Sequence, residues 1–169
     1  MPLLTGLKVF VGGPIQHALE KRVLSNDILN HIQVAITVLE SLGAEVFSAH
    51  RAEKFGAETH LFTPNEVSKR DRKWMEMCDI FVAVLPVCKR TQSLMRTDGT
   101  HIELGWASAL HRPIVLVTDK PFDTSSSHLL KGLAAIARVE HIGINDFECD
   151  PHTLLRPLLA IKNDLEIQA

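Results

Sequence analysis

Hydrophobic residues along the chain fall into short strand-like runs, separated by stretches in which apolar positions follow helical spacing. The runs suited to strands are Lys8–Val11, Glu45–Phe47, Ile80–Leu85, Ile114–Val117 and Arg138–Ile142. Strands that alternate with helices are typical of a parallel sheet with helices on both faces. The pattern therefore predicts an α/β fold with a doubly wound parallel sheet.

Four stretches predict helices. Between the first two runs, apolar residues recur at helical intervals from Ile28 to Leu42, with Ser25 or Asn26 as the cap and Gly43 as the stop. The other helices are expected to begin at Thr63-Pro64-Asn65-Glu66, a capping box with proline at the first helical position, to run from about Ile102 to Leu110, and to begin near Asp150-Pro151. No internal repeat is evident, so residues 1–169 are expected to form a single domain.

Composition narrows the class of protein. With 169 residues and 46% hydrophobic content, the chain can bury a substantial core. The 18 basic and 20 acidic residues give a formal charge of -2, which offers no basic field for a nucleic-acid backbone. No signal-peptide pattern precedes Lys8, and no apolar run reaches membrane-spanning length. We therefore expect a cytoplasmic protein with neither a nucleic-acid nor a membrane partner.

Cysteine and histidine spacing gives no sign of a disulfide framework or a metal site. The three cysteines, Cys78, Cys88 and Cys149, lack CxxC spacing, and the nine histidines form no HExxH or HxH cluster. We expect neither a metal nor another cofactor.

Loops that follow the strands are the expected place for a ligand, because ligands of doubly wound sheets collect where the strand order reverses. The loops Gly12–Leu24 and Pro86–Thr97 would flank that point if the first and third strands are neighbours. Gly12-Gly13 allows a ligand to approach the backbone closely, although tight turns also use glycine for its conformation alone.

Several side chains near this edge could contact a ligand. Arg51 could neutralise a phosphate or carboxylate and His50 could donate to a sugar hydroxyl, or both could lie in a solvated loop. Phe10, Phe55 and Trp74 could form a wall for base stacking, although single aromatic residues in a small domain commonly belong to the core.

Glu103 lies near the start of a predicted helix, behind a glycine-bearing loop. Free backbone N–H groups and the helix dipole would hold a buried carboxylate there in its ionised form, facing a ligand cleft. The alternative is an ordinary first-turn glutamate on a solvated helix.

Asp71 lies one helical turn before Trp74, and a carboxyl beside an indole is partly desolvated. Desolvation raises a carboxyl pKa and suits the group to giving a proton to a leaving group, unless Asp71 belongs to the charged face Lys69–Lys73. An ionised Glu103 and a protonated Asp71 would match retaining glycosyl transfer, in which a nucleophile attacks the anomeric carbon while an acid assists departure.

Four stretches carry a resemblance to a known family: Val9–Pro14, Ala49–Glu58, Asp71–Ala83 and Gly99–Ser108. They resemble the nucleoside 2-deoxyribosyltransferase superfamily, and within it most the cytidine 5′-monophosphate N-glycoside hydrolases of nucleoside-antibiotic biosynthesis. The resemblance implies a five-stranded parallel sheet of the Rossmann or flavodoxin-like type. It also implies a nucleophile at Glu103 and an acid at Asp71 that protonates or hydrogen-bonds the departing base.

The resemblance further implies a homodimer or higher homo-oligomer in which a neighbouring subunit completes each pocket. The segment after the fourth strand commonly does so, and here that segment is Ser125–His128, with Ser127 as the candidate.

Departures from the family pattern bear on the substrate. Six residues before the nucleophile, the transferases carry an aspartate that contacts the sugar 5′-hydroxyl, the hydrolases tend to carry serine, and this chain has Thr97. A hydroxyl can donate to a phosphate, so Thr97 favours a 5′-monophosphate, whereas Asp98 would favour a free nucleoside if its side chain entered the pocket. Gln16 stands where the hydrolases carry arginine, and a compensating charge could come from Lys21, Arg22 or Arg96.

The leading hypothesis is an N-glycosidase that cleaves a nucleoside 5′-monophosphate, with a CMP-like pyrimidine favoured, into free base and ribose or deoxyribose 5-phosphate. The alternatives are a nucleoside 2-deoxyribosyltransferase acting on free nucleosides and a non-catalytic nucleotide-binding module, although a pure binder needs no nucleophile. The predicted catalytic residues are Glu103 and Asp71, and the predicted substrate-binding residues are Phe10, Gly12, Gly13, Gln16, His50, Arg51, Phe55, Thr97, Asp98, Gly99 and Ser127.

Overall fold

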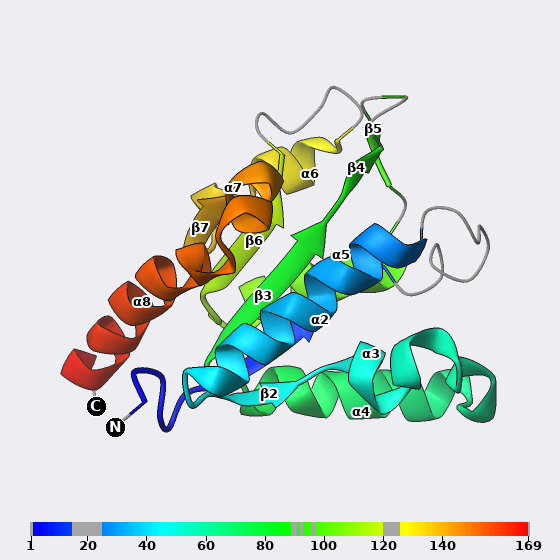
Figure 1. Ribbon diagram of the computed structural model, residues 1–169, viewed down its shortest axis with the longest axis horizontal. Coiled ribbons are helices and arrows are strands. Elements are labelled where there is room, and N and C mark those ends of the chain that lie inside the picture. Colours follow the sequence, from blue (N-terminus) through cyan, green and yellow to red (C-terminus); the bar gives the residue numbers. More distant parts are fainter. Residues whose placement is uncertain are drawn as a thin grey trace.

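A five-stranded parallel sheet forms the centre of the molecule (Figure 1). The computed structural model describes residues 2–14, 25–88, 91, 93–95, 97–119 and 126–168. The sheet order is β2-β1-β3-β6-β7, with β1 Lys8–Gly12, β2 Glu45–Phe47, β3 Ile80–Leu85, β6 Ile114–Thr118 and β7 Val139–Ile142. The predicted parallel α/β fold is confirmed, and β1 and β3 are neighbours, as the predicted ligand edge requires.

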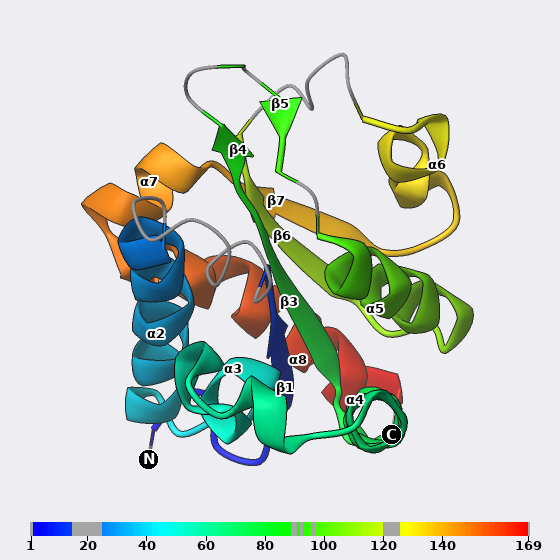
Figure 2. The same ribbon diagram turned by 90° about the vertical axis from the view of Figure 1, so that its right-hand side faces the viewer.

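Helices cover both faces of the sheet, as Figure 2 shows. One face is covered by α2 (Ser25–Ser41), α7 (Ile144–Cys149) and α8 (Leu155–Gln168), and the other by α4 (Pro64–Met77), α5 (Asp98–Ala109) and α6 (His128–Lys131). The shorter elements are α3 (Ala49–Ala52), η1 (Lys54–Gly56), η2 (Thr59–Leu61), η3 (Leu133–Ala135), η4 (Pro151–Leu154) and the antiparallel pair β4 (Val87–Cys88) and β5 (Ser93–Leu94).

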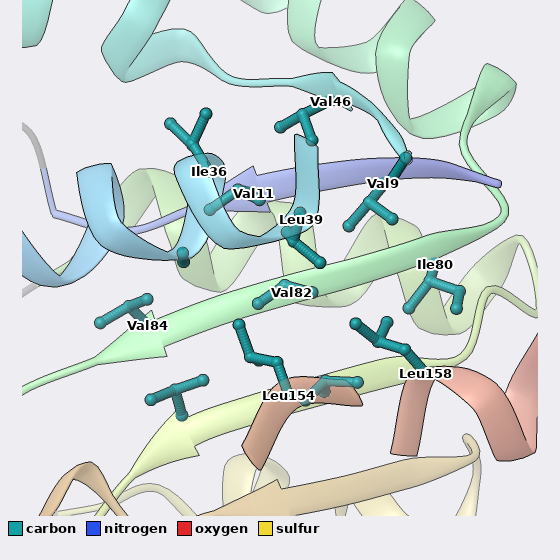
Figure 3. Close-up of a cluster of buried hydrophobic side chains, with 14 of the residues drawn as sticks. Val9, Val11, Ile36, Leu39, Val46, Ile80, Val82, Val84, Leu154 and Leu158 are labelled. Atoms are coloured by element: carbon teal, nitrogen blue, oxygen red, sulfur yellow. The ribbon is translucent and has the colours of Figure 1, made fainter. Parts of the chain in front are cut away.

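Alternate residues of the central strands enter two separate cores, because successive side chains of a strand point to opposite faces. Val82 and Val84 of β3 pack with α2 and α8, and Figure 3 shows this cluster. Phe81 and Leu85 of the same strand pack with α4 and α5 on the other face. Burial on both faces explains why the strand reads as an unbroken apolar run.

The start of α4 agrees with its prediction in detail. The Thr63 hydroxyl accepts from the Glu66 N–H at 3.3 Å, and the Glu66 carboxylate accepts from the Thr63 N–H at 2.8 Å. Reciprocal bonds of this kind satisfy N–H groups that a helix start leaves free. The capping box thus fixes the first turn of the helix that carries Asp71.

The predicted start of α5 was wrong, whereas that of the last helical segment was right. α5 begins at Asp98 and not near Ile102, because the Thr97 carbonyl already accepts the first helical bond, from the His101 N–H at 3.0 Å. The last helical segment begins at Pro151 with Asp150 as its cap, first as the η4 turn and then, without a break, as α8 from Leu155. Within the described residues, no helix is both long and apolar enough to cross a membrane.

Candidate active site

A cavity of about 420 Å³ opens at the carboxyl end of β1, between the segment that follows β2 and the start of α5. It lies at the β1–β3 neighbour pair, where the strand order reverses. Its size falls within the usual range for small-molecule sites, roughly 300–1,000 Å³. The described residues that line it are Gly12, Gly13, Pro14, Ala49, His50, Glu53, Thr59, Phe62, Pro64, Val67, Ser68, Asp71, Thr97, Asp98, Gly99, Thr100 and Glu103.

Glu103 lines this cavity from the second turn of α5 and is only 8% exposed. Burial raises the pKa of Glu103 well above its usual range, the charge of Asp71 raises it further, and Arg70 opposes both effects. This shift is opposite in direction to the one expected from a helix start. The helix begins five residues before Glu103, and desolvation dominates at that depth.

Gly12 leaves room for the Glu103 carboxylate at the end of β1. A Cβ at Gly12 would lie 2.5 Å from Glu103 Oε2 and 2.9 Å from the Phe81 ring. Side-chain atoms of ordinary residues do not approach so closely, so this position accepts only glycine without displacing the carboxylate. Gly12 and Gly13 both line the cavity, but the space left by the missing Cβ of Gly12 is filled by the Glu103 carboxylate and not left for a ligand.

Asp71 lines the opposite wall, from α4, and is buried rather than part of the charged face. Burial raises its pKa, as predicted, although Arg70 opposes the shift and Glu53 adds to it. Arg70 Nε donates to Asp71 Oδ1 at 2.8 Å, and its terminal nitrogen donates to Glu53 Oε1 at 2.6 Å. Arg70 thus joins the two buried carboxylates, with its guanidinium against the rings of Phe62 and Trp74.

Glu53 is a cavity residue to which the sequence analysis gave no role. It is 2% exposed, and its second oxygen accepts from the Thr59 hydroxyl at 2.7 Å. It follows α3 directly and precedes Lys54 and Phe55, both of which have positive φ. Its signal was its place in the Ala49–Glu58 stretch that carries the family resemblance, and positive φ at two successive non-glycine residues gives that stretch its sharp turn.

His50 faces the cavity from α3 and is 1% exposed. Burial lowers the pKa of His50 to about 4, and the Pro14 backbone and Glu53 oppose this shift only partly. The ring is therefore neutral at physiological pH, with one nitrogen able to donate and the other able to accept. Neither nitrogen has a well-formed hydrogen bond within the described part of the chain, so both can serve a ligand.

The first turn of α5 forms the remaining wall. Thr97 is 5% exposed and Asp98 is exposed, and both line the cavity together with Gly99 and Thr100. The Thr100 hydroxyl is buried and has no hydrogen-bond partner among the described residues. Backbone N–H groups at a helix start and nearby hydroxyls are donors that favour an anionic ligand.

Four of the predicted substrate-binding residues do not line the cavity. Phe10 is fully buried in the core below it, and Arg51 turns away to bond Glu40 and the Val46 carbonyl. Phe55 packs against the core of the α2 face. The Ser127 hydroxyl caps α6 by accepting from the Leu130 N–H at 3.2 Å. Gln16, Lys21, Arg22, Arg96 and Ser125 lie outside the described residues.

Phe10, Phe55 and Trp74 do not form the aromatic wall that was one of their two possible roles; they pack in or against the cores, which was the alternative. Phe10 and Trp74 contact each other edge to face, with ring centroids 5.9 Å apart, and Trp74 stacks on Phe47. The aromatic side chain that lines the cavity is Phe62, just before the α4 capping box. Among the described residues, no group of His, Cys, Asp and Glu side chains is arranged to hold a metal ion.

Fold and cavity together define a parallel α/β domain in which three buried carboxyl groups, those of Glu53, Asp71 and Glu103, face one ligand site at the strand-order reversal. The family model described as nucleoside 2-deoxyribosyltransferase matches residues 17–147, and the chain belongs to this family. The resemblance stated from the sequence is thereby confirmed. Membership supports an enzyme of the N-glycosidase and glycosyltransferase kind.

Solved structures give a consistent result. BlsM is 28% identical, with a TM-score of 0.72 over 94% of this chain and 93% of that one. The CMP N-glycosidase BcmB of Clostridium botulinum is 26% identical, with a TM-score of 0.55 over 82% and 88%. A 2-deoxyribosyltransferase of Bacillus psychrosaccharolyticus, at 21% identity and a TM-score of 0.54 over 83% and 90%, shares the fold. A search of curated proteins found no match.

Proposed function

We propose that this protein is an N-glycosidase that cleaves a nucleoside 5′-monophosphate, preferably a pyrimidine nucleotide, into free base and sugar 5-phosphate. The observation that carries the proposal is the pair of buried carboxyl groups, Glu103 and Asp71, in one cavity. Such a pair supplies the two functions of retaining glycosyl transfer. The similarity to the CMP N-glycosidase BcmB supports the choice of substrate.

In the proposed reaction one proton serves both carboxyl groups. Burial raises the pKa of Glu103, so we assign the shared proton to Glu103 in the empty site and let it pass to Asp71 when the substrate binds. The Glu103 carboxylate then attacks C1′, the C1′–N bond breaks, and Asp71 gives the proton to the departing base. Water hydrolyses the glycosyl ester while Asp71 accepts a proton from it, which restores the carboxyl group and releases the sugar phosphate.

We assign the base to the part of the cavity wall that is formed by the buried, neutral His50, the Glu53 carboxylate and Phe62. The phosphate is assigned to the first turn of α5, with Thr97, Gly99 and Thr100 as donors. Thr97 is buried at the cavity whereas Asp98 is exposed, which supports the hydroxyl rather than the carboxylate as the contact. No metal or organic cofactor takes part.

The test is incubation of the pure protein with CMP, dCMP, cytidine, AMP and GMP, followed by chromatography of the free bases. We expect release from CMP or dCMP, a loss of at least about a thousandfold in Glu103→Ala, and wild-type rates in the surface control Glu76→Gln. Absence of release from every substrate, or a Glu103→Ala variant as active as wild type, would refute the proposal.

Deoxyribosyl transfer is the second candidate, because the matching family model describes transferases. It uses the same nucleophile and differs in what resolves the glycosyl ester. Adding a second free base to the same assay separates the two: a new nucleoside in the chromatogram selects transfer, and its absence selects hydrolysis.

We also propose a homodimer in which the segment around Ser127 reaches the partner's cavity. Ser127 does not line the cavity of its own chain, and Leu129, two residues further on, is 85% exposed. Sedimentation velocity should give a dimer in the wild type and a monomer with little activity in Leu129→Asp. A monomeric wild type with full activity would contradict this assembly.

A further inference from the structure

Thr97 and His101 form a closed contact at the first turn of α5. His101 Nδ1 lies 2.8 Å from the Thr97 hydroxyl oxygen and 2.8 Å from the Thr97 carbonyl oxygen. The same carbonyl also accepts from the His101 backbone N–H at 3.0 Å. His101 therefore reaches back over one turn and touches both oxygens of the residue that precedes the helix.

The carbonyl fixes the direction of these bonds. A carbonyl oxygen has no hydrogen to give, so the 2.8 Å contact favours the tautomer in which His101 Nδ1 carries the proton. In that tautomer the N–H also serves the Thr97 hydroxyl oxygen, which then accepts rather than donates. The hydroxyl hydrogen of Thr97 stays available for another acceptor, and Thr97 lines the cavity.

His101 also affects the helix start. A threonine at this position normally turns back and accepts from an N–H of the first turn, but the Thr97 side chain makes no such capping bond. The N–H groups of Gly99 and Thr100 have no acceptor inside the helix, because the first helical bond belongs to the His101 N–H. These donors lie beside the buried, unpartnered Thr100 hydroxyl.

We propose that His101 is a positioning residue that holds the Thr97 hydroxyl in its donating orientation toward the phosphate of a nucleotide. Through this contact His101 sets the preference for a 5′-monophosphate over a free nucleoside. The inference rests on the proposed function. It adds a residue that acts through Thr97 and does not itself line the described cavity. The exposed Asp98 carboxylate beside the same turn makes a correctly aimed donor more necessary.

Two variants separate this role from a merely structural one. Asparagine places an N–H donor close to where Nδ1 lies, whereas leucine fills similar space without a donor. We expect His101→Leu to lose about tenfold or more in kcat/KM for CMP, mainly through KM, with little change for cytidine. His101→Asn should retain most of the preference. The matched control is Ile102→Ala, an exposed position on the same helix.

Helix propensity gives the opposite order, because leucine is the better helix former. A role in helix stability alone therefore predicts that His101→Asn is the worse variant, and this result would overturn the proposal. Equal losses for CMP and cytidine in His101→Leu would overturn it as well.

Calorimetry separates this inference from the proposed chemistry. Binding of CMP and cytidine to Glu103→Gln, with and without His101→Leu, measures the preference without turnover. If the wild type releases no base but the preference still falls in the double variant, the proposed reaction fails and the role of His101 stands. If CMP binding does not change, the role of His101 fails whatever the reaction.

Discussion

At the scale of single residues, the site depends on one contact between backbone and carboxylate. Gly12 ends the central strand β1, and the Glu103 carboxylate occupies the space that a side chain would take there. Protein interiors are closely packed, so the Glu103 carboxylate can take this position only because Gly12 has no Cβ. A residue larger than glycine at position 12 would therefore disturb the Glu103 carboxylate.

Gly12→Ala should therefore impair activity strongly, because the new Cβ would displace the Glu103 carboxylate or the Phe81 ring. A shift of about 1 Å in a reacting group costs about a hundredfold, so we expect a loss of that order in kcat/KM. The matched control is Gly105→Ala on α5, where a Cβ meets no atom within 4 Å. It should keep its activity and gain about 1 kcal/mol in helix stability. Similar kinetics for the two variants would refute the steric argument.

Sequence alone could identify Glu103, Asp71 and His50, because each stands in a recognisable local context. It gave Glu53 no role beyond a place in the resemblance stretch Ala49–Glu58, because its contact with Arg70 joins α4 to a residue 17 positions earlier. It also assigned Phe10 to the ligand, whereas β1 directs that side chain into the core beneath the cavity. Residues joined by tertiary contacts leave no periodic signal along the chain.

At the scale of elements, α4 and α5 carry the two carboxyl groups that we propose to react, and the starts of these helices differed in how well they could be predicted. The α4 start carries its own signal, since a capping box and a proline mark it in the sequence. The α5 start uses Thr97 without a capping bond and continues through Gly99, a weak helix former. Rules based on capping residues fail where a helix start has no capping bond. Here the uncapped start of α5 lines the ligand cavity.

Strands were predicted more accurately than helix starts, because burial on both faces leaves continuous apolar runs. β3 coincides with the predicted Ile80–Leu85, and β2 with Glu45–Phe47. The α7 helix was missed, since six residues are too few to show a helical period.

At the scale of the whole molecule, the buried Glu103 should make stability depend on pH. Its pKa is near 4.5 in an exposed carboxyl and is raised well above that value in the fold. Between these two values the folded chain holds a proton that the unfolded chain has lost. The free energy of unfolding therefore falls as pH rises through this window and stays reduced above it.

Glu103→Gln removes this cost and should be more stable than the wild type near neutral pH. The difference should shrink toward about pH 4, where both folded and unfolded wild-type chains hold the proton. Thermal denaturation of the two proteins across this pH range measures the effect. Glu76→Gln, at an exposed position of α4, should follow the wild-type curve. A variant less stable than the wild type at neutral pH would show that Glu103 is held ionised after all.

The placement of the cavity walls bears on how such an enzyme can diversify. Gly12 and Glu103 are tied to the central strands and the core, whereas His50, Glu53 and Phe62 lie on the segment that follows the edge strand β2. Edge segments accept insertions and exchanges that central strands do not. If the proposed function holds, descendants of this chain can acquire new base preferences by remodelling residues 49–63 while they inherit the proposed nucleophile Glu103 unchanged.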